Sequence, residues 1–144
     1  MRELWTAFLA ISMLLVAKAA ASESCEQGNE SMTVLRSDQT RVSLVLSRQK
    51  LAETPGWNAG VDSPPLSLSA AVDIASKWGN KRYSEFDEIA ISAISLKSSP
   101  CRRLPQRWYF VFEFSTWKAG RPSSSSGNWL AVLMDGSIVE PAVN

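Results

Sequence analysis

The sequence predicts an α+β domain in which one amphipathic helix packs on an antiparallel β-sheet meander, preceded by an N-terminal β-hairpin. Three observations support this prediction. Apolar residues alternate with polar ones in 41–47, recur at helical spacing in 68–78, and occupy every second position of 108–114 as aromatic side chains. These spacings are typical of a half-buried strand, an amphipathic helix and a strand with one apolar face. The apolar faces of a helix and a sheet are buried when the two pack together.

Residues 1–21 are predicted to be a cleaved export signal. A charged start precedes an apolar run from Leu4 to Ala17, and small residues follow it, which is the pattern of a secretory signal. The run is shorter than the roughly 20 residues of a membrane-spanning helix, which disfavours an uncleaved anchor. Cleavage fits after Ala19 or Ala21, and the polar residues 22–24 favour Ala21. We therefore expect a periplasmic or extracellular protein that does not associate with the membrane after cleavage.

Charge and length limit the classes of partner. The full chain carries 15 basic and 14 acidic residues, and losing Arg2, Lys18 and Glu3 with the signal leaves 13 of each. A formally neutral chain lacks the basic face that nucleic acids require, so no nucleic acid is expected as a partner. About 120 remaining residues are enough for one domain with its own core. We place that domain at 31–144, after a flexible arm at 22–30.

Two cysteines, Cys25 and Cys101, remain after cleavage. In an oxidising compartment such a pair is expected to form a disulfide. This bond closes a loop of about 77 residues, and the chain-entropy account assigns it about 4 kcal/mol of stability. Two alternatives stay open. One is a lipid anchor on Cys25, although Glu23 departs from the lipoprotein pattern, and the other is a pair of free thiols.

The N-terminal elements are a predicted hairpin and a connector. Residues 31–36 and 41–47 are expected to be strands joined by a turn at 37–40, while residues 25–30 are expected to be irregular. Residues 48–66 are rich in proline and glycine, so they are predicted to connect the hairpin to the helix. Within this connector, Trp57 is expected to insert into the core.

The predicted helix begins after Ser67, whose hydroxyl can cap the first turn. One stripe along it is apolar and consists of Leu68, Ala71, Val72, Ala75 and Trp78. Gly79-Asn80 is expected to end the helix after about 12 residues. A helix of this length is unstable alone in water, so it must pack on another element.

The C-terminal half is predicted to be a meander of about four strands. The first, 89–97, contains a bulge near Ser92-Ala93, where the alternation shifts. The next strand is 108–114, with its aromatic residues on one face and Tyr109, Val111 and Glu113 on the other. Residues 118–127 are expected to form a flexible hairpin tip. Residues 129–134 form a strand that is apolar on both faces, and Asp135-Gly136 turns the chain into a final strand at 137–140.

Three motifs suggest a family. They are the helix opening Pro64-Pro65-Leu66-Ser67-Leu68, the aromatic strand from Trp108 to Phe114, and the closing segment from Val132 to Val139. The stretch from Pro64 to Pro141 thereby resembles small exported bacterial domains of PepSY-like or cystatin-like architecture. The PepSY resemblance implies a domain that binds or restrains peptidases. Cystatins block cysteine peptidases through a Gln-x-Val-x-Gly hairpin, which none of the four glutamines of this chain begins.

The residue types available predict that the protein is not an enzyme. The chain contains no histidine, which excludes Ser-His-Asp and Cys-His catalysis and makes a metal or haem site implausible. No glycine-rich phosphate loop is present, and no cofactor is expected. The remaining candidates are carboxylates, which we interpret as loop, sheet-face and turn residues: Glu85, Asp87, Glu88, Glu113 and Asp135.

The sequence therefore predicts a non-catalytic exported binding or accessory module. It is expected to contact a protein or peptide through the open face of its sheet and the 118–127 hairpin. The candidate partner surface consists of Trp57, Arg102, Arg103, Arg107, Tyr109, Glu113 and Trp117. Two alternatives are a carrier with an apolar pocket between the 68–78 helix and the sheet, and a peptidase-restraining PepSY-like domain.

Overall fold

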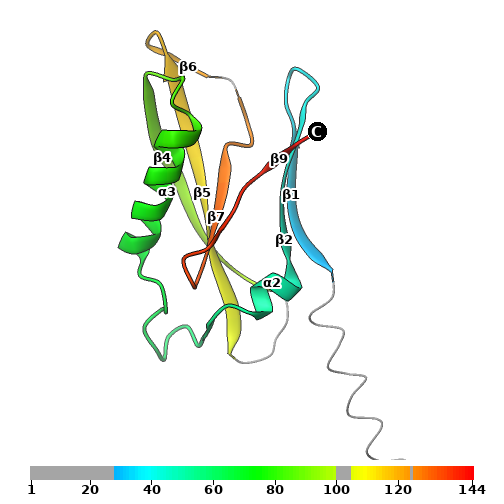
Figure 1. The fold of residues 1–144 in the computed structure, drawn as a ribbon, viewed down its shortest axis with the longest axis vertical. Helices are drawn as coiled ribbons and strands as arrows, with labels where there is room; N and C mark the ends of the chain where they lie inside the picture. Colours follow the sequence, from blue (N-terminus) through cyan, green and yellow to red (C-terminus); the bar gives the residue numbers. More distant parts are fainter. Residues whose placement is uncertain (1–27, 100–104, 124) are drawn as a thin grey trace, which may run out of the picture.

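A computed structural model describes residues 28–99, 105–123 and 125–144 (Figure 1). Its helices are α2 (Arg48–Ala52) and α3 (Leu68–Arg82). The strands, in chain order, are β1 (Asn29–Leu35), β2 (Arg41–Ser47), β3 (Gly56–Trp57), β4 (Glu88–Ser98), β5 (Gln106–Lys118), β6 (Arg121–Pro122), β7 (Trp129–Leu133), β8 (Ile138–Val139) and β9 (Ala142–Val143). All of the described strand pairs are antiparallel.

The strands form two sheets, and the small one stands to the right of the large one in Figure 1. In the large sheet β5 is central, with β4 along one edge and β3, β6 and β7 along the other, and β8 pairs with β7. The small sheet has the order β1-β2-β9. The α+β class is confirmed. The predicted architecture is incomplete, because the hairpin belongs to a second sheet and two helices are present.

One core lies between α3 and the large sheet. Ala71 and Ala75 of the helix are fully buried against Phe110, Phe112 and Phe114 of β5 and against β7. Ser67 caps the helix as predicted, since its Oγ accepts a hydrogen bond from the Ala70 backbone N–H at 3.2 Å. Leu68 departs from the predicted stripe, because the helix begins there and its side chain is 51% exposed.

A second core lies between the two sheets. Leu44 and Leu46 of β2 pack with Leu51 of α2 against the face of the large sheet that carries Tyr109, Val111, Ala131 and Leu133. The face of β5 that the sequence left open to solvent is thus covered by the small sheet. This arrangement explains why β7 is apolar on both sides, since each of its faces lies against a different layer.

The helix is longer than predicted. It continues through Gly79 to Arg82, and Tyr83 is its C-cap. Gly79 is buried within the helix, and a Cβ atom there would lie 2.6 Å from Cε1 of Phe114. This glycine therefore lets the helix approach an aromatic ring and does not end the helix.

The segment 118–127 is not one flexible hairpin tip. The chain turns at Ala119-Gly120, both with positive φ, and β6 pairs back on β5. Gly127 and Asn128 are then buried as the chain reaches β7. The guanidinium of Arg36, at the end of the β1–β2 hairpin, donates to the Ser126 carbonyl at 2.7 Å and to Oδ1 of Asn128 at 3.1 Å. This segment therefore joins the two sheets.

Several other predictions are confirmed or corrected. The β1–β2 hairpin, the bulge next to Ser92 and the Asp135-Gly136 turn are all present. The first strand begins two residues earlier than predicted, because Asn29 and Glu30 belong to β1. The connector contains α2 and β3, and after Pro141 the chain returns to the small sheet as β9, which was not predicted.

Some predictions fall on residues that the structure does not describe. The export signal, both cysteines, Arg102 and Arg103 lie in this part of the chain. The disulfide therefore stays a prediction. Among the described residues, neither helix is long and apolar enough to cross a membrane.

Candidate binding site at the β4 edge

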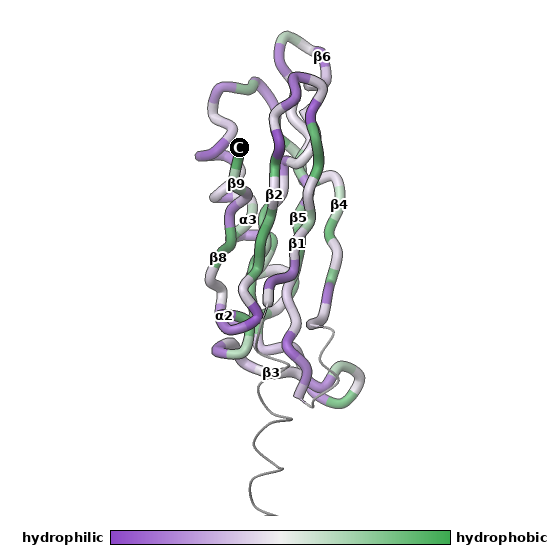
Figure 2. Tube along the Cα trace, turned by 90° about the vertical axis from the view of Figure 1, so that its right-hand side faces the viewer, coloured by the Kyte–Doolittle hydropathy of each residue, from purple (hydrophilic) through white to green (hydrophobic). Residues whose placement is uncertain are grey.

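Strand β4 forms one outer edge of the large sheet. It pairs with β5 from Glu88 to Ser98, and no other described strand pairs with it. In the view onto the small sheet, β4 is the outermost strand, beside β5 and beyond the cover that β1 and β2 provide (Figure 2). An edge strand presents backbone N–H and C=O groups that can pair with another chain.

A bulge divides β4 into two regular segments. Ile91 lies opposite Phe114 and Ala93 lies opposite Glu113, so Ser92 is the extra residue. The Ser92 hydroxyl donates to the backbone carbonyl of Glu113 at 3.1 Å. Because side chains alternate between faces, the extra residue reverses the alternation between the two segments.

The register assigns the side chains of β4 to the two faces of the sheet. Opposed residues share a face, so the α3 side carries four apolar residues of β4: Ile89, Ile91, Ile94 and Leu96. Ile89 and Ile91 are partly buried against the core under α3. Ile94 and Leu96 lie further along the strand and are 41% and 42% exposed. Two large apolar side chains thus lie next to each other at an accessible sheet edge.

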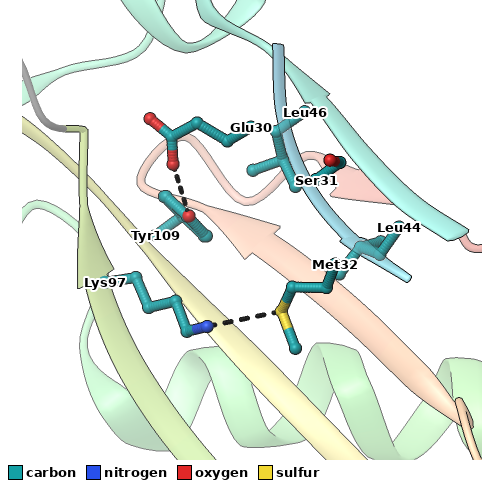
Figure 3. A pocket seen from close by; sticks show the side chains of 7 residues that line it. All are labelled: Glu30, Ser31, Met32, Leu44, Leu46, Lys97 and Tyr109. Atoms are coloured by element: carbon teal, nitrogen blue, oxygen red, sulfur yellow. Dashed lines mark hydrogen bonds between the residues drawn. The ribbon is translucent and has the colours of Figure 1, made fainter. Parts of the chain in front are cut away.

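Behind this edge, the two sheets enclose a pocket of about 130 Å³ (Figure 3). Its wall consists of Glu30, Ser31 and Met32 from β1, Leu44 and Leu46 from β2, Lys97 from β4 and Tyr109 from β5. Four polar residues from three different strands therefore meet beside the apolar side chains of Met32, Leu44 and Leu46.

The polar groups of this pocket form two hydrogen bonds. The Tyr109 hydroxyl donates to Oε2 of Glu30 at 2.6 Å, and the ammonium of Lys97 donates to the Met32 sulfur at 3.3 Å (Figure 3). Burial, reinforced by the Glu30 carboxylate, raises the pKa of the Tyr109 hydroxyl well above its ordinary value. Tyr109 is thus a neutral hydrogen-bond donor at physiological pH.

The pocket can hold only a small group. Its volume is close to that of an engineered cavity of about 150 Å³ that accepts benzene. A thioether is a weak acceptor, so the Lys97 ammonium can still interact with a nearby acidic group. The pocket therefore positions a cation at the end of β4, beside the exposed edge.

The predicted partner residues do not form one surface. Trp57 pairs with Gln106 at the start of β5, and its indole lies edge-on against Trp108, with 5.4 Å between ring centroids. Arg107 lies beside it and donates to the Thr54 carbonyl at 2.6 Å. Trp117 lies near the opposite end of β5, about 35 Å along the strand. Trp57 and Trp117 therefore do not build a common aromatic contact surface.

The other two predicted residues lie between these ends. Tyr109 is only 5% exposed and lies between the sheets, so it is not a surface residue. Glu113 is half-buried on the same face of β5, opposite Trp129 of β7 and Ala93 of β4. Covering by the small sheet removes the open face on which these two residues were expected to contact a partner.

The carboxylates considered for catalysis do not converge. Asp87 accepts a hydrogen bond from the Ala119 backbone N–H at 2.6 Å, so it supports the β5–β6 turn. Asp135 accepts from the backbone and hydroxyl of Ser137 within its own turn. Among the described residues, no group of three acidic or thiol side chains could hold a metal ion.

The sequence did not single out Ile94, Leu96 or Glu30 as functional residues. The strand prediction for 89–97 was correct, but strand order alone decides which strand lies at an edge. A usable signal was present, since 88–98 holds four large apolar residues and only two charges, Glu88 and Lys97. This composition is typical of a strand that can accept a partner strand.

No family model matches this chain, and comparisons with curated proteins and with solved structures found no match either. The resemblance to PepSY-like and cystatin-like domains therefore stays a prediction from the sequence motifs.

Proposed function

We propose that this protein is an exported, non-catalytic binding module that accepts an extended segment of a partner protein as an added strand along β4. The observation that carries the proposal is the exposed pair Ile94 and Leu96 on an eleven-residue edge strand. In this mode of recognition, main-chain hydrogen bonds supply affinity and alternate side chains supply specificity. The partner segment is expected to be extended, with apolar residues at every second position.

Packing elsewhere favours this function over an apolar-ligand carrier. Ala71 and Ala75 of α3 are fully buried against the sheet, and the ring of Phe114 occupies the space beside Gly79. The interface between α3 and β5 is therefore filled at these positions. The pocket of about 390 Å³ at the end of α3 is lined by Trp78, Lys81, Arg82, Ile138 and Glu140, and its three charged residues do not suit an apolar ligand. The chain also lacks histidine, which agrees with a binding role and not a catalytic one.

A random peptide library displayed on phage tests this proposal. Peptides selected on the immobilised protein are expected to have alternating apolar residues and to bind with Kd values of roughly 1–100 µM, as measured by fluorescence polarisation. Leu96→Glu should weaken binding by at least about tenfold, because a carboxylate then lies where apolar contact is needed. Circular dichroism and thermal unfolding check that the variant is folded.

Val61→Glu is the matched control. Val61 is 82% exposed in the connector before α3, so the same chemical change there should leave the affinity unchanged. Selected peptides that bind wild type and Leu96→Glu equally well would show that the β4 edge is not the binding site.

A further inference from the structure

We infer that the partner strand for β4 is β4 of a second copy of this chain, paired antiparallel about a two-fold axis between Ser92 and Ala93. The inference rests on the proposed role of β4 as an open pairing edge, and it names the partner. Closed two-fold dimers are the commonest form of homo-oligomer, and they require a self-complementary surface. The sequence of β4 is self-complementary in one particular register.

In this register, four residue pairs form on each side of the axis. They are Glu88 with Lys97, Ile89 with Leu96, Ala90 with Ser95, and Ile91 with Ile94, the second residue of each pair belonging to the second copy. Apolar residues thus lie opposite apolar residues, and small residues lie opposite each other. The only two charges of the strand lie opposite each other with opposite sign.

The bulge makes this register consistent with the two faces of the sheet. Because Ser92 reverses the alternation, Ile89 and Ile91 share the α3 side with Ile94 and Leu96. Each apolar pair therefore lies on the α3 side, and the Glu88–Lys97 pair lies on the opposite side with Ala90 and Ser95. The two bulges meet at the axis. On both sides of the axis, a regular segment of one β4 strand therefore pairs with a regular segment of the other.

Other registers lose these matches. A shift by one residue pairs side chains on opposite faces, because every matched pair changes parity. A shift by two residues keeps the faces aligned for the outer pairs only. It also separates Glu88 from Lys97 and moves the bulge of one copy away from that of the other. One register alone satisfies face, charge and bulge together.

The surroundings of β4 leave room for this pairing. The small sheet lies over β5 and β7, and β4 extends beyond it as the outermost described strand (Figure 2). The second copy would cover Ile94 and Leu96, which are otherwise exposed. Two copies would form one continuous sheet, with both α3 helices on one side and both small sheets on the other.

The charge pair is expected to select the register more than to supply affinity. Glu88 is exposed, and exposed ion pairs contribute little to stability. Two like charges placed opposite each other oppose association, however, and the two-fold axis repeats each contact. The Lys97 ammonium is also available, since its present acceptor is the Met32 thioether.

Sedimentation equilibrium of the protein produced from the full chain tests this inference between about 10 µM and 1 mM. The dimer should be weak, because strand pairing buries less than the roughly 1,600 Å² of a standard interface. The average mass should nevertheless approach that of two chains at the upper end. Glu88→Lys and Lys97→Glu should each raise the dissociation constant by at least about tenfold.

The double variant Glu88→Lys/Lys97→Glu provides the decisive comparison. It restores opposite charges in this register alone, so dimerisation should return to within about threefold of wild type. The controls Glu53→Lys and Lys77→Glu make the same charge changes at exposed positions outside β4 and should have no effect. Thermal unfolding checks each variant, and Glu88→Lys alters an exposed side chain only.

The outcomes separate this inference from the proposed function. A protein that stays monomeric at about 1 mM, or a dimer that neither single reversal weakens, would overturn self-pairing. If self-pairing is overturned in this way but Leu96→Glu abolishes the binding of selected peptides, the proposed binding function stands. Failure of the double variant to recover would reject this register.

Discussion

At the scale of single residues, Tyr109 shows how a polar group is accommodated between the two sheets. Its ring is part of the inter-sheet core, and its hydroxyl donates to Glu30 of the first strand. This contact fixes the start of β1 against β5. A buried polar group that loses its hydrogen-bond partner costs free energy. Removing either the hydroxyl or the carboxylate should therefore destabilise the protein by more than the hydrogen bond itself contributes.

Tyr109→Phe is expected to lower the free energy of unfolding by about 1–2 kcal/mol at neutral pH, because the Glu30 carboxylate loses its donor. Urea unfolding measures this change. A double-mutant cycle with Glu30→Gln should show coupling, since the two residues share one contact. Additive effects would indicate that the hydroxyl and the carboxylate do not interact in solution.

The raised pKa of Tyr109 also leads us to expect a loss of stability at alkaline pH. Its pKa is raised in the folded protein from an ordinary value of 10.0, chiefly by burial. Above pH 10 the unfolded chain releases the phenol proton while the folded chain retains it, so stability should fall as pH rises further. The Tyr83→Phe background leaves Tyr109 as the only tyrosine, and its phenolate absorbance then follows the transition directly.

At the scale of elements, the segment between β6 and β7 decides how the two sheets meet. Gly127 has φ +78°, and a Cβ atom there would lie 2.7 Å from Cγ1 of Val34 and 3.0 Å from Cβ of Val42. The β1–β2 hairpin therefore packs directly on this backbone. The same glycine was read from the sequence as part of a flexible tip, because serine and glycine composition does not reveal tertiary contacts.

Gly127→Ala should destabilise the protein by about 2–4 kcal/mol, because overlap with the hairpin adds to the cost of a left-handed backbone. Gly120→Ala is the matched control, since Gly120 has φ +70° and open space around it. The control should lose only about 1–2 kcal/mol, the backbone cost alone. Equal losses in urea unfolding would show that the hairpin does not press on Gly127.

At the scale of the whole molecule, described residues that are close in sequence to the two cysteines neighbour each other in the fold. Glu30, five residues after Cys25, contacts Tyr109, and Tyr109 lies opposite Lys97, four residues before Cys101. The described neighbours of both cysteines are therefore at the same end of the molecule. This placement supports the pairing predicted from the cysteine count.

The intact mass of the exported protein tests two predictions, which are cleavage of the signal after Ala21 and the disulfide between Cys25 and Cys101. It should match a chain beginning at Ser22, and reduction should add the mass of two hydrogen atoms. Reduction should also lower Tm by at least about 10 °C, since the bond closes a long loop. The Cys25→Ser/Cys101→Ser variant should not respond to reductant, and a heavier mass carrying a lipid on Cys25 would contradict the disulfide.

Local sequence pattern determined the hairpin, the start of α3, the bulge and the aromatic strand, because spacing and capping act within a few residues. Tertiary structure alone decided that the hairpin became a second sheet over the far face of β5, that α3 passed through Gly79, and that β4 lay at an edge. These features depend on contacts between residues distant in sequence, such as Gly79 with Phe114 and Gly127 with Val34. The candidate site was missed for the same reason, since an edge exists only once strand order is set.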